Sequence, residues 1–504
     1  MPRPTLFRVL LQQRHWDDWA VFDTRFQETA RQVGAELGSA AVSSATVPQR
    51  TFARWFSGTW FGSPQRHAVP VLERMLGFSC AELFLPAPDV LHASAAVHER
   101  PGVDASVRIG ERWATSRLFL SLTESAADAW ELCGRGSLDG TTVAVQFHPA
   151  VRDRSGRLRL HPAEEDVLHG FVRPARRGVV VGVEERGNGE SGLYAVDAAA
   201  VRRSLAGASG KDGAVVVPGA HELDDLTYGI LWSLVQLDDG LLAHDRALDE
   251  EHRALEAYLP LERSALSRGA LPGLTGAAAG WMGSAFCARY IGRRLERVSA
   301  APVFWTREQT GEESAPWLFF AHKVDYLTEL GARFGGAPDP IVRVFVVPEE
   351  QVRRSPRYER LLLFLAVALM ERLGITVRVV VDEGFAGVDG FALVLGERVV
   401  VANWVRTEEV WAARTTTERR ELAAYRDTVG EATALDTLKQ GEGPAGRLRA
   451  LAGLLGLEWG WLVGRCRDLG SSGVTGMVVP RSRLITLSAL EDTLVFVGAL
   501  DPAR

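Results

Sequence analysis

The sequence predicts a multidomain protein in which an all-α N-terminal domain is followed by α/β domains. Three observations support this class. At 504 residues the chain is too long for one hydrophobic core, its first 86 residues show short helical patterns, and a strand–helix–strand pattern begins near residue 341. We expect a helical domain at residues 1–88, a linker at 89–104, α/β domains at 105–265 and 266–410, and a mostly helical region at 411–504.

The composition is that of a globular protein, with 46% hydrophobic and 24% charged residues. The net charge of −6 argues against a protein that binds nucleic acid over its whole surface. Residues 1–86 carry nine arginines and seven acidic residues, a net charge of +2, which leaves −8 for the remainder. This distribution is compatible with a local DNA-binding module at the N-terminus.

The four cysteines are scattered, and no CxxC pair occurs, which argues against a disulfide framework and a thiolate zinc site. We expect Cys80 and Cys287 to be buried free thiols. The longest apolar stretch, Leu361–Met370, is half the length of a membrane span, and Met1–Arg14 lacks the pattern of a signal peptide. The sequence therefore predicts a cytoplasmic protein with no membrane partner, cofactor or metal.

Residues 1–86 contain helical segments at Leu6–Gln13, Phe22–Leu37, Ala68–Leu76 and Cys80–Phe84. A further helix is predicted over Val47–Gly58, with Thr46 as its N-cap, Pro48 in its first turn and Gly58 as its stop. Phe52, Trp55 and Phe56 follow i, i+3, i+4 spacing, so they form one apolar face.

The other face of that helix carries Gln49, Arg50, Ala53 and Arg54. Arginine reads guanine through two hydrogen bonds and glutamine reads adenine, so this face suits the major groove of DNA. Arg66 follows a glycine turn and is expected to contact phosphate. The predicted DNA-contacting residues are Thr46, Gln49, Arg50, Thr51, Arg54 and Arg66.

Arg50–Gly58 (RTFARWFSG) and Val71–Phe84 (VLERMLGFSCAELF) together resemble the second half of the lambda-repressor-like, XRE-type helix-turn-helix domain. This resemblance implies a helix-turn-helix fold at residues 1–88, with Phe22–Leu37 as the preceding helix. Residues 38–46 are longer than the tight turn of that family. The alternative is a helical domain that docks a protein partner.

The remaining chain shows strand patterns at Thr141–Phe147 and at Gly178–Glu184, which forms a hairpin with Leu193–Val196. A long amphipathic helix follows at Leu223–Leu242. Its C-terminal Asp238 and Asp239 oppose the helix dipole, which suggests that they pair with an arginine elsewhere.

A second α/β pattern consists of strands at Ile341–Val347 and Thr376–Val381 around a helix at Tyr358–Leu373 that is capped by Gly374. A hairpin at residues 391–402 follows. Residues 301–405 loosely resemble a phospholipase-D-like fold. Active members need an HxKxxxxD arrangement, whereas this chain has only His322-Lys323-Val324-Asp325, so the resemblance implies a sensor that lacks the catalytic residues.

Other chemical patterns favour structural roles. Gly441–Gly446 satisfies GxGxxG but follows a helix, so we expect a helix–helix loop. His161, Glu164, Glu165 and His169 lack the HExxH spacing and are expected to begin a solvated acidic helix.

The segment Trp281–Tyr290, with Phe304 and Trp305, is rich in aromatic residues and has arginines close by. It is either core or an apolar effector pocket for an acidic ligand. The residues proposed for that pocket are Trp281, Phe286, Arg289 and Trp305.

These patterns predict a sequence-specific DNA-binding transcriptional regulator, not an enzyme. We expect it to bind operator DNA as a homodimer, because one small module binds weakly. A small-molecule effector is a further expected partner. The alternatives are an enzyme that acts on a phosphoester or nucleotide and a protein-interaction scaffold.

Overall fold

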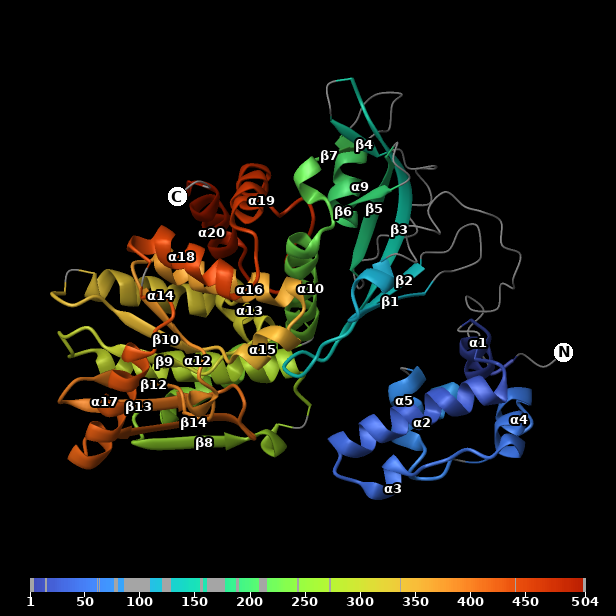
Figure 1. The fold of residues 1–504 in the computed structure, drawn as a ribbon, viewed down its shortest axis with the longest axis horizontal. Helices are drawn as coiled ribbons and strands as arrows, with labels where there is room; N and C mark the ends of the chain where they lie inside the picture. The colour runs from blue at the N-terminus through green and yellow to red at the C-terminus, as the bar shows by residue number, and fades with distance from the viewer. Residues whose placement is uncertain are drawn as a thin grey trace. The chain divides into compact units, whose positions relative to one another are not determined.

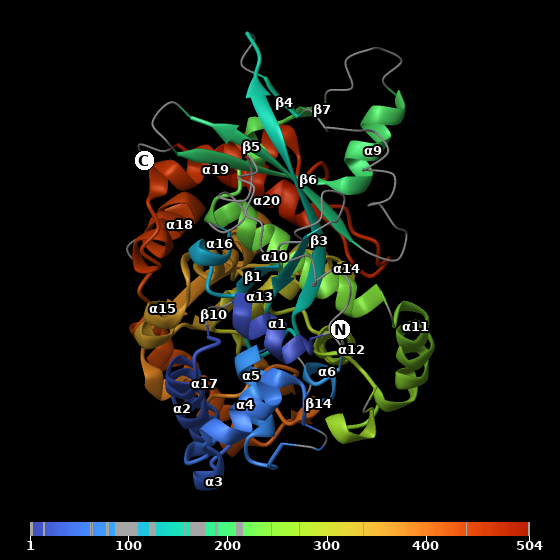
Figure 2. The same cartoon turned by 90° about the vertical axis from the view of Figure 1, so that its right-hand side faces the viewer.

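The protein is described by a computed structural model (Figures 1 and 2). It describes residues 4–13, 16–60, 62, 64–76, 80–85, 109–119, 128–154, 157–160, 177–186, 190–207, 215–242, 244–271, 273–335, 337–439 and 441–501. The chain divides into a first unit, residues 1–99 with 120–127, and a second unit, residues 100–119 with 128–504. The predicted boundaries near residues 265 and 410 lie within the second unit, and the predicted linker lies outside the described residues.

The first unit is helical in the residues described (Figure 1). Its helices lie close to the predicted segments. They are α1 (Leu6–Gln13), α2 (Trp19–Glu36), α3 (Ala40–Ser43), α4 (Gln49–Ser57), α5 (Val69–Leu76) and α6 (Cys80–Leu83). Phe7, Phe22 and Phe26 form the centre of its core and are completely buried.

The predicted fold class, an all-α helix-turn-helix domain joined to α/β domains, is wrong. A helix-turn-helix joins two helices by a turn of three or four residues. Here residues 37–48 separate α2 from α4, and they contain the additional helix α3. This helix packs on the end of α2 at Gly34, where an added Cβ would lie 2.0 Å from Ser43 Oγ.

The second unit begins with a mixed sheet whose strands pair in the order β1-β2-β3-β4-β7, while β5 joins β3 and β6 joins β5. All these pairs are antiparallel except β3–β5. The strands are β1 (Ser116–Phe119), β2 (Asp128–Leu132), β3 (Thr141–Arg152), β4 (Leu158–Leu160), β5 (Gly178–Glu185), β6 (Ser191–Asp197) and β7 (Val215–Val217). The predicted pairing of the 178 and 193 strands is confirmed.

Helices α9 (Ala198–Gly207), α10 (Asp225–Leu242) and α11 (Asp245–Ala254) accompany this sheet along the chain. Asp224 caps α10, because its carboxylate accepts hydrogen bonds from the amides of Leu226 and Thr227. The solvated acidic helix start predicted at residues 161–169 lies outside the described residues.

A second mixed sheet has the order β11-β10-β9-β12-β13-β14-β8. Strands β9, β10 and β11 are parallel, and the other neighbours are antiparallel. The strands are β8 (Arg263–Ser267), β9 (Val303–Thr306), β10 (Val342–Val346), β11 (Thr376–Val380), β12 (Phe391–Val394), β13 (Arg398–Asn403) and β14 (Glu409–Thr416).

The strand–helix–strand unit predicted at residues 341–381 is confirmed, as is the hairpin after it. Its helix ends as expected, with Gly374 in the left-handed conformation at φ 77°. The α/β class nevertheless fails for the second unit as a whole. Antiparallel pairs dominate both sheets, because tight hairpins such as that at Gly396 return the chain without a crossover helix.

Side chains alternate between the two faces of the second sheet. In β10, Val342, Val344 and Val346 face a small core shared with α17 (Arg419–Ala434). Phe345 faces the main core. Helices on the main-core side include α12 (Gly276–Leu295), α13 (Gly311–Phe319), α14 (Ala321–Phe334) and α16 (Arg357–Arg372), and α15 (Glu349–Arg354) precedes α16.

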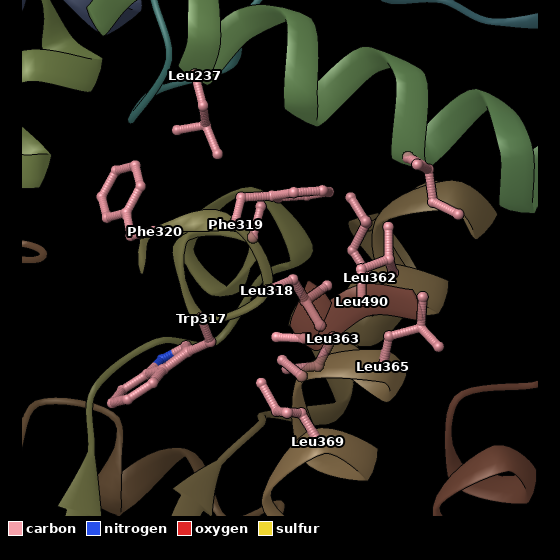
Figure 3. Close-up of a cluster of buried hydrophobic side chains, with 14 of the residues drawn as sticks. Leu237, Trp317, Leu318, Phe319, Phe320, Leu362, Leu363, Leu365, Leu369 and Leu490 are labelled. Atoms are coloured by element: carbon pink, nitrogen blue, oxygen red, sulfur yellow. The ribbon is translucent and has the colours of Figure 1, made fainter. Parts of the chain in front are cut away.

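Helix α16 is buried on every face from Leu361 to Glu371, and Tyr358 and Glu359 before this stretch are also buried. A helix without a polar face has to be enclosed by other elements. Figure 3 shows leucines of α16 beside Leu490 of α20 and near Phe319 of α13, with Leu237 of α10 on the far side of Phe319. The C-terminal helices that complete this enclosure are α18 (Gly443–Leu454), α19 (Trp459–Ser472) and α20 (Ser488–Gly498). Of the helix–helix loop predicted at Gly441–Gly446, only residues 441–442 precede α18, and residues 443–446 form the first turn of this helix.

Asp238 and Asp239 pair with arginines, as predicted. The completely buried Asp238 carboxylate pairs with Arg177, and Asp239 binds both Arg177 and Arg481. Asp238 also accepts hydrogen bonds from the amides of Arg481 and Ser482. This network joins the first sheet, the end of α10 and the segment before α20.

Cys80 and Cys287 are buried free thiols, as expected. Within the described residues, no helix combines the length and apolarity needed to cross a membrane.

Two glycines of α12 provide a matched test of its packing on β14. A Cβ on Gly283 would lie 2.0 Å from the Val410 carbonyl oxygen, whereas a Cβ on Gly292 would meet no atom within 4 Å. We expect Gly283→Ala to destabilise the protein by about 1–3 kcal/mol. Gly292→Ala should stabilise it by about 0.5–1 kcal/mol through helix propensity. Thermal unfolding of both variants checks this, and equal shifts would contradict the described packing.

Candidate functional site

Helix α4 is positioned by the proline before it. Pro48 is its N-cap, and the helix begins at Gln49. The prediction of Thr46 as N-cap is therefore wrong, since a residue that precedes proline favours an extended backbone and Val47 cannot enter the helix. Val47 is buried and Thr46 is exposed. Gly58, with φ 70°, ends the helix as predicted.

The aromatic face of α4 anchors it to the core of the first unit, as predicted. Phe52 and Trp55 are buried, and Phe56 is half-buried. The Phe52 ring lies 4.8 Å from that of Phe22, and the Trp55 ring lies 5.8 Å from that of Phe7. These contacts fix the rotation of the helix, so its opposite face is fixed as well.

The opposite face of α4 is exposed and unpaired. Gln49, Arg50, Ala53 and Arg54 are exposed, and Thr51 is half-buried beside them. None of the Gln49, Arg50 and Arg54 side chains forms a hydrogen bond or ion pair with another described residue. Arg66 is also exposed, in the turn before α5. Residues 37–72 contain three arginines and no aspartate or glutamate, so this stretch is positive without neutralisation in sequence.

The four residues of the predicted effector pocket do not converge in the second unit. Trp281 packs edge-on against His252 and His322, and Phe286 stacks on Trp411 at 4.3 Å. Arg289 pairs with Glu256. Trp305 lies in the small core and stacks on Phe391, on the face of the sheet opposite to α12. Because successive side chains of a strand point to opposite faces of the sheet, Trp305 is separated from the other three residues.

The second unit instead contains a cavity of about 50 Å³ at the end of β9, between the sheet and helices α12 and α14. It lies where the strand order reverses, because β10 and β11 follow on one side of β9 and β12 lies on the other. Ligands of open sheets containing parallel strands bind at such points. Its charged lining is Arg307, Glu308, Lys323 and Arg343.

Lys323 and Glu308 form a buried ion pair in this cavity, with 3.6 Å between Lys323 Nζ and Glu308 Oε1. Trp317 Nε1 donates to Glu308 at 3.0 Å. Burial lowers the pKa of Lys323 to about 8, although Glu308 opposes this shift. Lys323 therefore remains mostly protonated at neutral pH.

The phospholipase-like residues do not form a catalytic group. His322 Nε2 hydrogen-bonds to Ser284 Oγ at 2.9 Å, Lys323 points at Glu308, and Asp325 is exposed. Burial lowers the pKa of His322 well below its usual value, so the imidazole is neutral. Within the described part of the chain, no group of three or more His, Cys, Asp or Glu residues is arranged to hold a metal.

A larger cavity of about 560 Å³ lies nearby, and Trp404 and Val405 line both cavities. This volume is within the range of small-molecule sites. The buried carboxylates Glu312, Glu313 and Glu359 line it. Glu312 accepts hydrogen bonds from the amides of residues 135, 136 and 138.

Two arginines at this cavity pair with the other carboxylates. Arg135 Nη1 lies 3.1 Å from Glu359, and Arg406 Nε lies 2.7 Å from Glu313. Arg406 has a φ of 54°, the one positive value among non-glycine residues of the described chain. Such backbone strain clusters at functional sites. The arrangement offers polar anchors above the apolar Leu138 and Leu237.

Sequence reasoning missed the charged residues of both cavities. One signal was present: Arg343 interrupts an apolar strand, IVRVFVV, at a position that alternation places on the same face as Phe345. Glu359 and Glu312 gave no such signal, because charged residues near helix starts are usually solvated.

No protein-family model matches the chain, and neither curated proteins nor solved structures yield a significant match.

Glu359 gives a pH-dependent prediction. Burial raises its pKa to about 7, Arg135 partly opposes this, and Glu312 adds to it. Because the folded-state pKa exceeds the unfolded value, stability is lost as the pH rises from about 4.5 to 7. We expect Glu359→Gln to remove this loss. Its stability relative to the parent should be about 2 kcal/mol more favourable at pH 8 than at pH 5.5.

Denaturant unfolding followed by tryptophan fluorescence at the two pH values measures this difference. Glu349→Gln, on the exposed first turn of α15, is the control and should show no such difference. If Glu359→Gln gave the same relative stability at both pH values, the buried carboxyl would titrate normally.

Proposed function

We propose that the protein is a DNA-binding transcriptional regulator whose first unit contacts duplex DNA through the exposed face of α4. The observation that carries this proposal is the fixed orientation of Gln49, Arg50 and Arg54, which are unpaired with other described residues and lie opposite a buried aromatic face. Unpaired arginines on a rigid helix are available to an anionic partner without breaking internal ion pairs.

The chemistry of these side chains suits both base and phosphate contacts. Arginine binds guanine or phosphate through two parallel hydrogen bonds, and glutamine binds adenine in the same way. Thr51, beside them, offers a hydroxyl, and the exposed Arg66 would contact phosphate in this proposal. The acid-free stretch of residues 37–72 removes local repulsion of phosphate.

A homodimer is part of this proposal. One unit presents three arginines on this stretch, which neutralise about three phosphates and give only a shallow salt dependence. Two copies on paired half-sites double the contacts and provide the affinity that one surface lacks.

The test is binding of the purified full chain to DNA from upstream of its own coding sequence. A scrambled duplex of the same composition is the competitor, and fluorescence anisotropy is measured across a salt series. We expect preference for the upstream fragment and an affinity that falls steeply with salt. Arg50→Ala with Arg54→Ala removes four arginines from the homodimer, so it should weaken binding at least tenfold and flatten the salt slope by up to about 4.

The matched control replaces two arginines of α2 in the same unit. Arg25 pairs with Glu28, and Arg31 donates to the carbonyl of Gln27. Arg25→Ala with Arg31→Ala removes the same charge and should leave DNA affinity within about threefold of the parent. If both double variants lost DNA affinity equally, net charge alone would explain the effect. If the parent protein did not bind DNA, the proposal would be refuted.

A further inference from the structure

The small cavity of the second unit encloses more positive than negative charge. Arg343, Lys323 and Glu308 are 4%, 3% and 4% exposed, so two cations share one carboxylate. Arg307, at the edge of the cavity, has a side chain that is 20% exposed. It pairs with Asp389, so its charge is already neutralised and does not add to that of the buried group. The enclosed group therefore carries one unneutralised positive charge.

The other titratable groups at this cavity do not supply the missing anion. Burial raises the pKa of Tyr326 and of Cys287 to about 12 in each case, so both side chains are neutral. Ser284 and Asn403 also line the cavity but carry no charge.

The aromatic rings compensate only in part. Lys323 Nζ lies 3.3 Å from the centre of the Trp317 ring, and the Arg343 guanidinium lies 4.6 Å from that of Phe304. A desolvated cation–π contact contributes about 2 kcal/mol. Burying an ion costs several kcal/mol, so the rings do not replace a counter-ion.

The guanidinium of Arg343 also has two unused donors. Its Nη1 donates to Thr306 Oγ1 at 3.1 Å, while Nε and Nη2 have no hydrogen-bond partner. The Tyr326 hydroxyl lies within reach of Arg343 and favours its charged form through a weak side-chain hydrogen bond, but the two side chains do not meet full hydrogen-bond geometry. Nε and Nη2 form one edge of the guanidinium, and that edge binds the two oxygens of a carboxylate side by side.

We propose that this cavity is a binding site for a small monoanion, a carboxylate of formate or acetate size, held by the free edge of Arg343 and neutralised by Arg343 and Lys323 together. The volume of about 50 Å³ fits a ligand of this size. The site is in the second unit and goes beyond the proposed DNA binding, on which it does not depend.

The experiment uses the full chain, with chloride exchanged for formate or acetate at constant ionic strength. We expect saturable stabilisation, with the unfolding temperature of the second unit raised by about 3 °C at a hundredfold excess over Kd. Titration calorimetry should give one site per chain. The absence of a saturable response to both carboxylates would overturn the proposal.

Three variants separate the proposed contacts from general electrostatics. Arg343→Lys keeps the charge but loses the two-donor edge, so formate affinity should fall at least tenfold. Arg343→Met removes the unneutralised charge, so it should abolish the response and should not lower the unfolding temperature in chloride. Lys323→Met also removes the unneutralised charge but leaves the Arg343 edge in place. It should therefore weaken the formate response, and it tests charge neutralisation if either Arg343 variant fails to fold.

The matched control is Arg294→Met, because Arg294 also lies over an aromatic ring, 4.1 Å from that of Tyr290, but outside the cavity lining. It should respond to formate as the parent does. An unchanged response in Arg343→Met would overturn the assignment. Arg50→Ala with Arg54→Ala should also keep the formate response, so failure of DNA binding and failure of this proposal are distinguishable.

Discussion

The burial of α16 is the constraint on which the second unit depends. From Leu361 to Glu371 this helix has no exposed face, and the sheet at β11 covers only part of it. Helices α10, α13, α18 and α20 close the remaining directions, and Figure 3 shows labelled side chains of α10, α13 and α20 in this cluster. The helix also carries two glutamates into the core, and each has to be compensated by the elements that enclose it.

The two glutamates are compensated to different degrees. Glu371 receives two hydrogen bonds from Arg447 and one from the Val377 amide, far from either cavity. Glu359 pairs with one arginine, Arg135, whose side chain is 43% exposed. Glu359 also lines the larger cavity. The incomplete compensation of Glu359 explains its raised pKa, and Arg343 shows the same imbalance with the opposite charge. Both imbalances lie at cavities, where a ligand can supply what the chain does not.

Local sequence patterns located most elements but not their assembly. Helix α1, the strand–helix–strand unit around α16 and the glycine stops at residues 58 and 374 follow from periodicity and from backbone preferences that neighbouring residues alone determine. The separation of α2 from α4 by α3 depends on packing at Gly34, which no periodicity reveals. The cavities depend on residues far apart in the sequence, such as Arg135 and Glu359, which are 224 positions apart, so no spacing rule could predict them. The residues predicted for an effector pocket lie apart because Trp305 belongs to the small core on the other side of its sheet.

The missing partners of arginines have different meanings in the two units. Arg50 and Arg54 are exposed, so water solvates them and their free energy is low without any partner. Their arrangement makes DNA a suitable partner but does not require one. Arg343 is buried, and water cannot replace a counter-ion there at a similar free energy. In our proposal an anion at Arg343 therefore stabilises the second unit itself, whereas DNA at α4 is a matter of recognition. This difference explains why the first surface has to be tested by affinity and specificity, while the second site can be tested by stability alone.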